Sequence, residues 1–276
     1  MSAPTSLDPW EQSVDARTGT APARRRLPLY EAGAIPVPFV IRGNTERIAR
    51  DTHWDEHSHP THELLWNDHG ASTATVGDRV WTVTAHHALW IPAGVRHTGW
   101  APAGTWQRAA MFSVDHVPAI SELPTAVELT PLLRLLLDRL SEARLDDRAR
   151  ATTEATILDV LEPAEHELLL RLPRSGLVAP IVERIRTSPS DGTSLAEWAA
   201  LLGVSTRTVT RTFESETGLG FARWVATARV QHAITRLIAG DSIDEVAAAV
   251  GYRSATAFGT AFRRVTGTSP GRFRTG

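Results

Sequence analysis

The chain of 276 residues carries a formal net charge of −2 at pH 7 and contains no cysteine. Its length favours two domains joined by a connecting element, and the absence of cysteine excludes disulfides, thiolate nucleophiles and thiolate metal ligands. No apolar run approaches the length of a membrane-spanning helix, and the first residues lack the layout of a secretory signal, so we expect a cytoplasmic protein without a membrane partner.

The N-terminal part of the chain is predicted to be a tail followed by a β domain. Residues 1–28 are rich in proline, alanine, serine and arginine without sustained periodicity, which predicts a flexible tail. Residues 29–117 change to short runs of β-branched and aromatic residues separated by glycine, proline and aspartate, which predicts antiparallel strands. Gly77-Asp78 lies between two such runs and predicts a hairpin whose tight turn uses positive φ values.

Residues 118–176 are predicted to be a helical linker. Leucines recur at three- and four-residue steps from Leu132 to Leu140, and the apolar pattern resumes from Ile157 to Leu169, which predicts two helices. A leucine stripe of this spacing is usually a core face, but in a linker it can equally pack against a second copy of the chain. The region is therefore also a candidate for homodimerisation.

Residues 177–276 are predicted to be helical throughout and to hold the basic charge of the chain. They contain twelve arginines and eight acidic residues, a net charge of +4, whereas residues 1–176 sum to −6. Because nucleic-acid binding is judged domain by domain, this excess permits DNA binding by the C-terminal domain.

Two helices separated by a tight turn are predicted around Gly203. Ser194 and Glu197 have the spacing of a capping box, which starts a helix, and Ser205 can cap the next helix after the glycine. The helical period turns a polar set outward on the second helix, namely Thr206, Arg207, Thr210, Arg211 and Glu214. This is the outline of a helix-turn-helix unit, and arginine can bind guanine through two parallel hydrogen bonds.

The same outline returns about fifty residues later in the sequence. A helix begins at Ile243, Gly251 occupies the turn, and Phe258 and Phe262 point inward from the next helix. The intervening residues 221–239 predict one long helix that joins both units into a single device. Half-sites one DNA turn apart, about 10 to 10.5 base pairs, suit such an arrangement.

A specific set of residues in this region matches a known family. The set comprises Ile243, Ala247, Gly251-Tyr252, Phe258, Phe262-Arg263-Arg264, Gly267, Ser269-Pro270 and Phe273-Arg274. Over residues 194–274 the chain resembles the AraC/XylS family of transcription regulators. The resemblance implies double-stranded DNA as a partner and contact with RNA polymerase.

The resemblance also implies which residues contact DNA. In the family the recognition helix of the first unit makes most base contacts, which here implies Arg207, Thr208, Thr210 and Arg211. In the second unit the matching positions are small, and they include Thr256 and Thr260, with Arg253, Arg263 and Arg264 expected on phosphates.

Histidine is concentrated in the predicted β domain, where nine of the eleven histidines lie between His53 and His116. His57 and His59 lie two apart, the spacing that places side chains on one face of a strand, and Glu63 follows. With Gly70 and with Pro92 to His97, these residues match the two cupin signatures.

The resemblance to cupins implies a metal site made of His57, His59, Glu63 and His97. Three imidazoles and one carboxylate suit a divalent transition metal such as zinc, nickel, manganese or iron. A histidine-lined pocket for an organic effector is the alternative. Many regulators of the family named above carry a cupin-like sensory domain.

These observations together predict an α+β protein. An N-terminal β-barrel of the cupin or jelly-roll type is joined by the helical linker to an all-α domain with two helix-turn-helix units. The predicted function is that of a sequence-specific DNA-binding transcription regulator, not an enzyme, whose cupin domain senses a metal ion or a small molecule. A metal-dependent cupin enzyme of the dioxygenase or isomerase type is the alternative.

Overall fold

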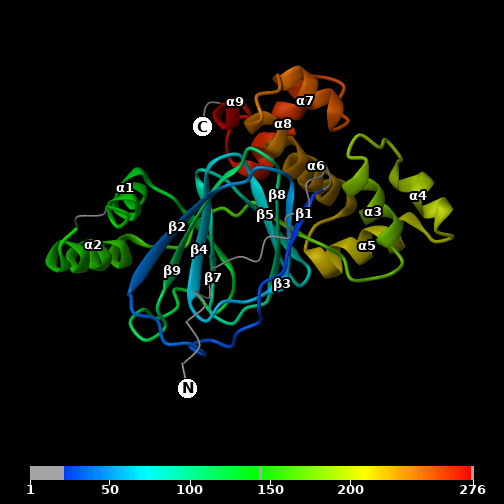
Figure 1. Cartoon of the computed structure of the whole chain (residues 1–276). Coiled ribbons are helices and arrows are strands. Elements are labelled where there is room, and N and C mark those ends of the chain that lie inside the picture. The colour runs from blue at the N-terminus through cyan, green and yellow to red at the C-terminus, as the bar shows by residue number, and fades with distance from the viewer. Residues whose placement is uncertain (1–21, 143–144, 275–276) are drawn as a thin grey trace.

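Runs of alternating apolar and polar residues form the strands of two sheets. The structure, a computed structural model, describes residues 22–142 and 145–274 (Figure 1). Sheet A contains, in spatial order, β1 (Ala23–Arg25), β3 (Thr52–His57), β8 (His97–Ala101), β5 (Ser72–Val76), β6 (Arg79–Val83) and β11 (Leu169–Arg171). Sheet B contains β10 (Thr125–Glu128), β7 (His87–Ile91), β4 (His62–His69), β9 (Trp106–Phe112) and β2 (Ile41–Arg47).

The two sheets pack face to face as a sandwich, which agrees with the jelly-roll form of the prediction, although the described strands do not close into a barrel. Because successive side chains of a strand point to opposite faces, Leu65 of β4 enters the core between the sheets, while Leu64 and Trp66 face outward. The outward residues of sheet B are covered by α1 (Pro131–Arg139) and α2 (Asp147–Val160), so that this sheet is apolar on both faces.

The β5–β6 hairpin is confirmed, but its turn differs in detail from the prediction. The two strands pair in antiparallel register on either side of Gly77 and Asp78. Gly77 takes a φ of +57°, whereas no non-glycine residue among those described has a positive φ. The turn therefore depends on the glycine alone, as a turn with glycine at its first central position does.

Two segments form strands where the sequence predicted other structure. Residues 1–21 of the predicted tail lie outside the described residues, but Ala23–Arg25 forms β1, which pairs in parallel with β3. Arg25 is buried, forms an ion pair with Glu46 and lies over the ring of Trp54. These two contacts stabilise its charge inside the domain. Leu169, predicted to end a helix, instead begins β11.

The C-terminal domain consists of seven helices among the described residues. They are α3 (Ala179–Thr187), α4 (Leu195–Leu201), α5 (Thr206–Thr217), α6 (Phe221–Ile238), α7 (Ile243–Ala249), α8 (Ala255–Thr266) and α9 (Gly271–Arg274). The helix-turn-helix outlines are confirmed as α4–α5 and α7–α8. Gly203 and Gly251 take φ values of +67° and +82° in the two turns, a backbone conformation that glycine adopts without a steric penalty.

Capping and burial explain why these helices begin and pack where they do. Ser194 with Glu197, and Ser242 with Glu245, each form a complete capping box. Val209 and Phe213 of α5 are fully buried with Trp224 of α6 in the core of the first unit. Phe258 and Phe262 of α8 are likewise buried in a separate core in the second unit.

Strand β11 connects the two domains directly. Its residue Leu169 packs against the core between the sheets, Leu168 belongs to the core of the second helix-turn-helix unit, and Leu170 belongs to the core of the first. Trp224 Nε1 donates to the carbonyl oxygen of Arg171 at 2.7 Å. Gln231 Nε2 donates to the carbonyl oxygens of Val80 and Leu168 at 3.1 and 3.3 Å.

None of the helices in the described ranges is long and apolar enough to cross a membrane.

The position of Leu170 predicts a measurable stability effect. Leu170 is 3% exposed and lies in the core of the first unit, so Leu170→Ala should lower the free energy of unfolding by about 2 to 5 kcal/mol. The control Leu201→Ala removes a leucine that is 72% exposed and should change it by less than about 0.5 kcal/mol. Denaturant unfolding followed by tryptophan fluorescence checks both values, and equal effects would contradict the assignment of Leu170 to this core.

Candidate functional site

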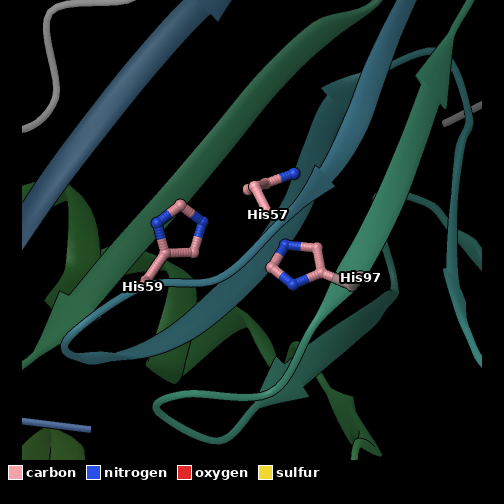
Figure 2. A group of neighbouring side chains, drawn as sticks. All are labelled: His57, His59 and His97. Atoms are coloured by element: carbon pink, nitrogen blue, oxygen red, sulfur yellow. The ribbon is translucent and has the colours of Figure 1, made fainter. Parts of the chain in front are cut away.

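Three histidines from neighbouring segments point toward one another inside the β domain (Figure 2). His57 on β3 and His97 on β8 are register partners in sheet A, and their ring centroids lie 4.1 Å apart. His59 follows the end of β3, and its ring lies 5.1 and 5.3 Å from the other two rings. One nitrogen from each ring can be chosen so that all three lie within 4.8 Å of one another.

His59 reaches the cluster by a route that the sequence did not predict. Strand β3 ends at His57, so the two histidines do not share a strand face. A register shift between Trp54 and His57 breaks the regular pairing of β3 with β8. The chain beyond His57 then turns back toward β4, which brings His59 to the same point from the side (Figure 2).

The backbone orients two of the imidazole rings. His57 Nδ1 donates to the carbonyl oxygen of Asp55 at 2.7 Å, and His97 Nδ1 donates to that of Val95 at 3.0 Å. A ring that donates from Nδ1 and is neutral keeps a lone pair on Nε2. Both rings are therefore held in the tautomer whose Nε2 can bind a metal.

Glu63 completes the cluster from the opposite sheet. It lies on β4, and its Oε2 is 3.6 Å from Nε2 of both His59 and His97. This oxygen is buried and has no hydrogen-bond partner among the described residues. The structure thus brings together all four residues that the cupin resemblance implied.

Burial keeps two of the three imidazoles, those of His59 and His97, uncharged. Burial lowers the pKa of His59 to about 3, with a further contribution from His57. It also lowers the pKa of His97 to about 4, and His57 acts in the same direction. Two imidazoles are therefore neutral near pH 7, the form that binds transition metals.

A small cavity of about 80 Å³ adjoins the cluster. Its wall includes Leu27 and Tyr30, which lie between β1 and β2 in the chain and were not predicted to be part of the site. Tyr30 is tied to Ser58, the residue between two of the histidines, because its N–H donates to Ser58 Oγ and its carbonyl accepts from it, at 2.8 and 2.7 Å. No sequence pattern indicated this contact, which depends on the tertiary fold.

The predicted base-reading residues occupy the first two turns of α5. Arg207 and Arg211 are exposed, and Thr208 and Thr210 are half-buried. The hydroxyl of Thr208 lies 2.9 Å from Ser205 Oγ at the helix cap, so it already has a local partner. The two arginines are therefore the side chains of this set that extend furthest into solvent.

The second unit presents a less charged surface. Thr256 and Thr260 are exposed on α8, and Thr260 Oγ1 donates to the carbonyl oxygen of Thr256 at 3.0 Å. Arg253 precedes the helix, while Arg263 and Arg264 lie in its last turn. Arg264 also lines a groove between α6 and α8, which makes Arg263 the better candidate of the pair for a phosphate contact.

Two family models match the chain. A model described as an AraC-like ligand binding domain matches residues 39–158, and a model described as a helix-turn-helix domain matches residues 198–276. The chain is 30% identical over 244 residues to the HTH-type transcriptional regulator NimR of Escherichia coli, covering 86% of both chains. It is 30% identical over 221 residues to the regulator RipA of Corynebacterium glutamicum, covering 77% of this chain and 62% of that one.

Solved structures of related proteins also align with the chain. ToxT from Vibrio cholerae aligns over 86% of this chain and 98% of its own length, with 10% identity and a TM-score of 0.36. The DNA-binding domain of AdpA in complex with a target DNA aligns over 37% of this chain and 92% of its own length, with 35% identity and a TM-score of 0.34.

A ligand-binding β domain joined to two helix-turn-helix units defines a DNA-binding transcription regulator that responds to a small molecule. The particular family follows from the family models and the relatives. The chain belongs to the AraC family of HTH-type transcriptional regulators.

The contrast between Arg211 and Arg263 yields a test of the DNA-binding surface. If Arg211 reads a base, Arg211→Ala should weaken specific binding by about 1 to 3 kcal/mol and relax discrimination at one position. If Arg263 contacts a phosphate, Arg263→Ala should weaken all duplexes alike and reduce the slope of log affinity against log salt by about 1. Fluorescence anisotropy over a salt series separates the two, and a uniform loss for Arg211→Ala would show that α5 has been assigned wrongly.

Proposed function

We propose that the β domain senses a divalent transition metal and that binding of the metal alters the affinity of the regulator for DNA. His57, His59, His97 and Glu63 would hold the ion, with zinc, nickel, manganese and iron as the candidates. The ion would supply a positive charge between the two sheets and link sheet A, through His57 and His97, to Glu63 of sheet B.

The buried oxygen of Glu63 is the observation that carries this proposal. A buried carboxylate oxygen without a partner is costly, because burial removes its hydration and nothing replaces it. The nearest nitrogens are those of His59 and His97, and neutral imidazoles do not balance its charge. A cation among these four side chains would balance it and accept the lone pairs of the imidazoles.

The size of the cavity favours a metal over a large organic effector. Pockets for drug-sized ligands usually measure about 300 to 1,000 Å³. The cavity next to the histidines measures about 80 Å³, which suits an ion with a few water molecules or a very small co-ligand. The four side chains and the cavity together support a site for a metal ion.

The proposal gives the metal a sensing role and not a catalytic one. The metal site lies in a domain that matches AraC-like ligand binding domains, and the relatives are named transcriptional regulators. Sheet A, which carries two of the ligands, also contacts both helix-turn-helix units through β11 and Leu168 directly before it. A change in sheet A would therefore reach the DNA-binding domain through direct contacts.

Elemental analysis of the purified full chain tests the metal site. After loading and desalting, the protein should retain about one ion per chain. His57→Ala combined with His97→Ala should abolish retention, and Glu63→Gln should weaken metal affinity at least about tenfold, because it removes the anionic ligand without changing the shape.

The matched control is His53→Ala combined with His69→Ala, since both histidines are exposed and lie outside the cluster. This variant should retain the metal. Retention by the His57 and His97 variant would exclude the site. Metal-dependent turnover of a small substrate without any change in DNA affinity would favour the cupin enzyme instead.

A second proposal concerns the linker helices. The leucine stripe is divided: Leu133 and Leu137 are buried against sheet B, whereas Leu132 and Leu135 are 52% and 66% exposed on α1. Figure 1 shows α1 and α2 on the side of the sandwich away from α3 to α9. We propose that this exposed face pairs two copies of the chain without obstructing the DNA-binding helices.

Sedimentation velocity at micromolar concentration tests the dimer. The wild-type chain should sediment as a dimer, and Leu132→Glu combined with Leu135→Glu should sediment as a monomer, because two buried carboxylates would oppose the contact. Leu123→Glu, at a leucine that is 58% exposed elsewhere, is the control and should leave the dimer intact. A monomeric wild-type chain would contradict the proposal.

A further inference from the structure

Arg229, on the middle of α6, contacts the loop that begins the first helix-turn-helix unit. Its Nε donates to the carbonyl oxygen of Pro189 at 2.8 Å, and its Nη2 donates to that of Asp191 at 2.7 Å. The side chain of Asp191 in turn accepts from the N–H of Thr193 at 2.9 Å, directly before Ser194 caps α4. Arg229 therefore holds the segment from which α4 starts.

The same guanidinium also contacts the turn of the second unit. The Cζ atom of Arg229 lies 5.7 Å from the centroid of the Tyr252 ring, in a cation–π arrangement. The Tyr252 ring lies 5.7 Å from that of Phe258, which is fully buried in α8. One side chain thus connects the loop before α4 to the reading helix of the second unit.

The two units also touch each other at this point. A Cβ atom at Gly251 would lie 2.9 Å from the Cα of Ser190, closer than such atoms approach in proteins, and 3.0 Å from Arg229 Nη2. The turn of the second unit therefore packs directly against the loop of the first. Only a residue without a side chain fits between them.

The geometry points to Arg229 as the residue that fixes the distance and angle between the two units, and hence the spacing of DNA half-sites that the regulator accepts. Helix α6 has 18 residues and is about 27 Å long at the usual rise per residue. The cores of the two units are separate clusters at the two ends of this helix. A contact that bridges the units at the middle of α6 restrains their relative motion in a way that the helix alone does not.

Arginine has the chemistry for this task. Its planar guanidinium donates in two fixed directions at once and presents a flat face to an aromatic ring, whereas the ammonium of lysine is a single point charge. Glutamine keeps part of the length and polarity but loses the charge and the fork. Arg229→Lys and Arg229→Gln therefore weaken the contacts of Arg229 to different degrees, and neither places an unpaired carboxylate at the interface.

Binding to duplexes of altered spacing tests the inference. Duplexes selected from a random library with the wild-type full chain supply the two half-sites, and one or two base pairs are then inserted or deleted between them. Each step rotates one half-site relative to the other, so the wild-type chain should lose affinity at least about tenfold per step. Arg229→Gln should lose less than about threefold per step while binding the selected duplex less tightly, and Arg229→Lys should fall between the two.

The control is Arg236→Gln, the same substitution seven residues further along α6. Arg236 pairs with Asp241 at the end of its own helix, at 2.6 Å, so its spacing profile should match that of the wild-type chain. Circular dichroism melting shows that each variant is folded, and Arg229→Lys replaces Arg229→Gln in the comparison if the latter does not fold. A folded Arg229 variant with the sharp wild-type profile would overturn the inference, as would equal broadening in Arg236→Gln. The metal content of the protein does not enter this experiment, so its outcome tests the role of Arg229 independently of the proposed metal site.

Discussion

The alternation of side chains at residues 168–170, at the start of strand β11, places one short segment in contact with the sandwich and with both helix-turn-helix units. Leu169 packs into the sandwich, while Leu168 and Leu170 on either side of it complete the cores of the second and first helix-turn-helix units. Because these three leucines are consecutive in an extended segment, one of them cannot move out of its core without moving the other two. Any shift of this segment relative to the rest of sheet A would therefore disturb both units together. The hydrogen bonds from Trp224 to Arg171 and from Gln231 to Leu168 and Val80 add direct links between α6 and this edge of the sheet.

The proposed metal site lies in the same sheet. His57 and His97 pair across β3 and β8, and the sheet continues through β5 and β6 to β11. Glu63 faces them from sheet B, so an ion among these side chains would tie the sheets together at one end of the sandwich. The contact path from the histidines to α6 is thus made of backbone hydrogen bonds within one sheet, followed by the leucines at positions 168 and 170. In the proposed mechanism, metal binding would affect DNA binding through this path.

The sequence predicted those parts of the fold that depend on the spacing of residues close together in the chain. The capping box at Ser194, the glycine turns and the inward phenylalanines of the helical domain follow from spacing along the chain, and the structure confirms them. The four candidate site residues could be predicted because the two cupin signatures fix their spacing. The density of histidines alone would have misled, since His87 belongs to the same histidine-rich region but stacks on Phe273 of α9 between the domains. Strands β1 and β11 could not be predicted, because three-residue strands have little pattern of their own and form only where a sheet edge receives them. The Arg229 bridge joins residues about 40 apart, and nothing in the spacing of those residues indicates it.

In the proposed mechanism, metal binding in the sandwich and DNA binding by the helices are coupled. Coupling between two sites is reciprocal, so an ion that changes the affinity for DNA must have its own affinity changed by DNA by the same factor. The most direct measurement is the metal dissociation constant of the full chain, by competition with a chelator of known affinity, with and without a saturating selected duplex. If the two sites are coupled, the two constants should differ by at least about fivefold, and a duplex of unrelated sequence should have a smaller effect. Equal constants with and without the selected duplex, in a protein that binds both ligands, would contradict it.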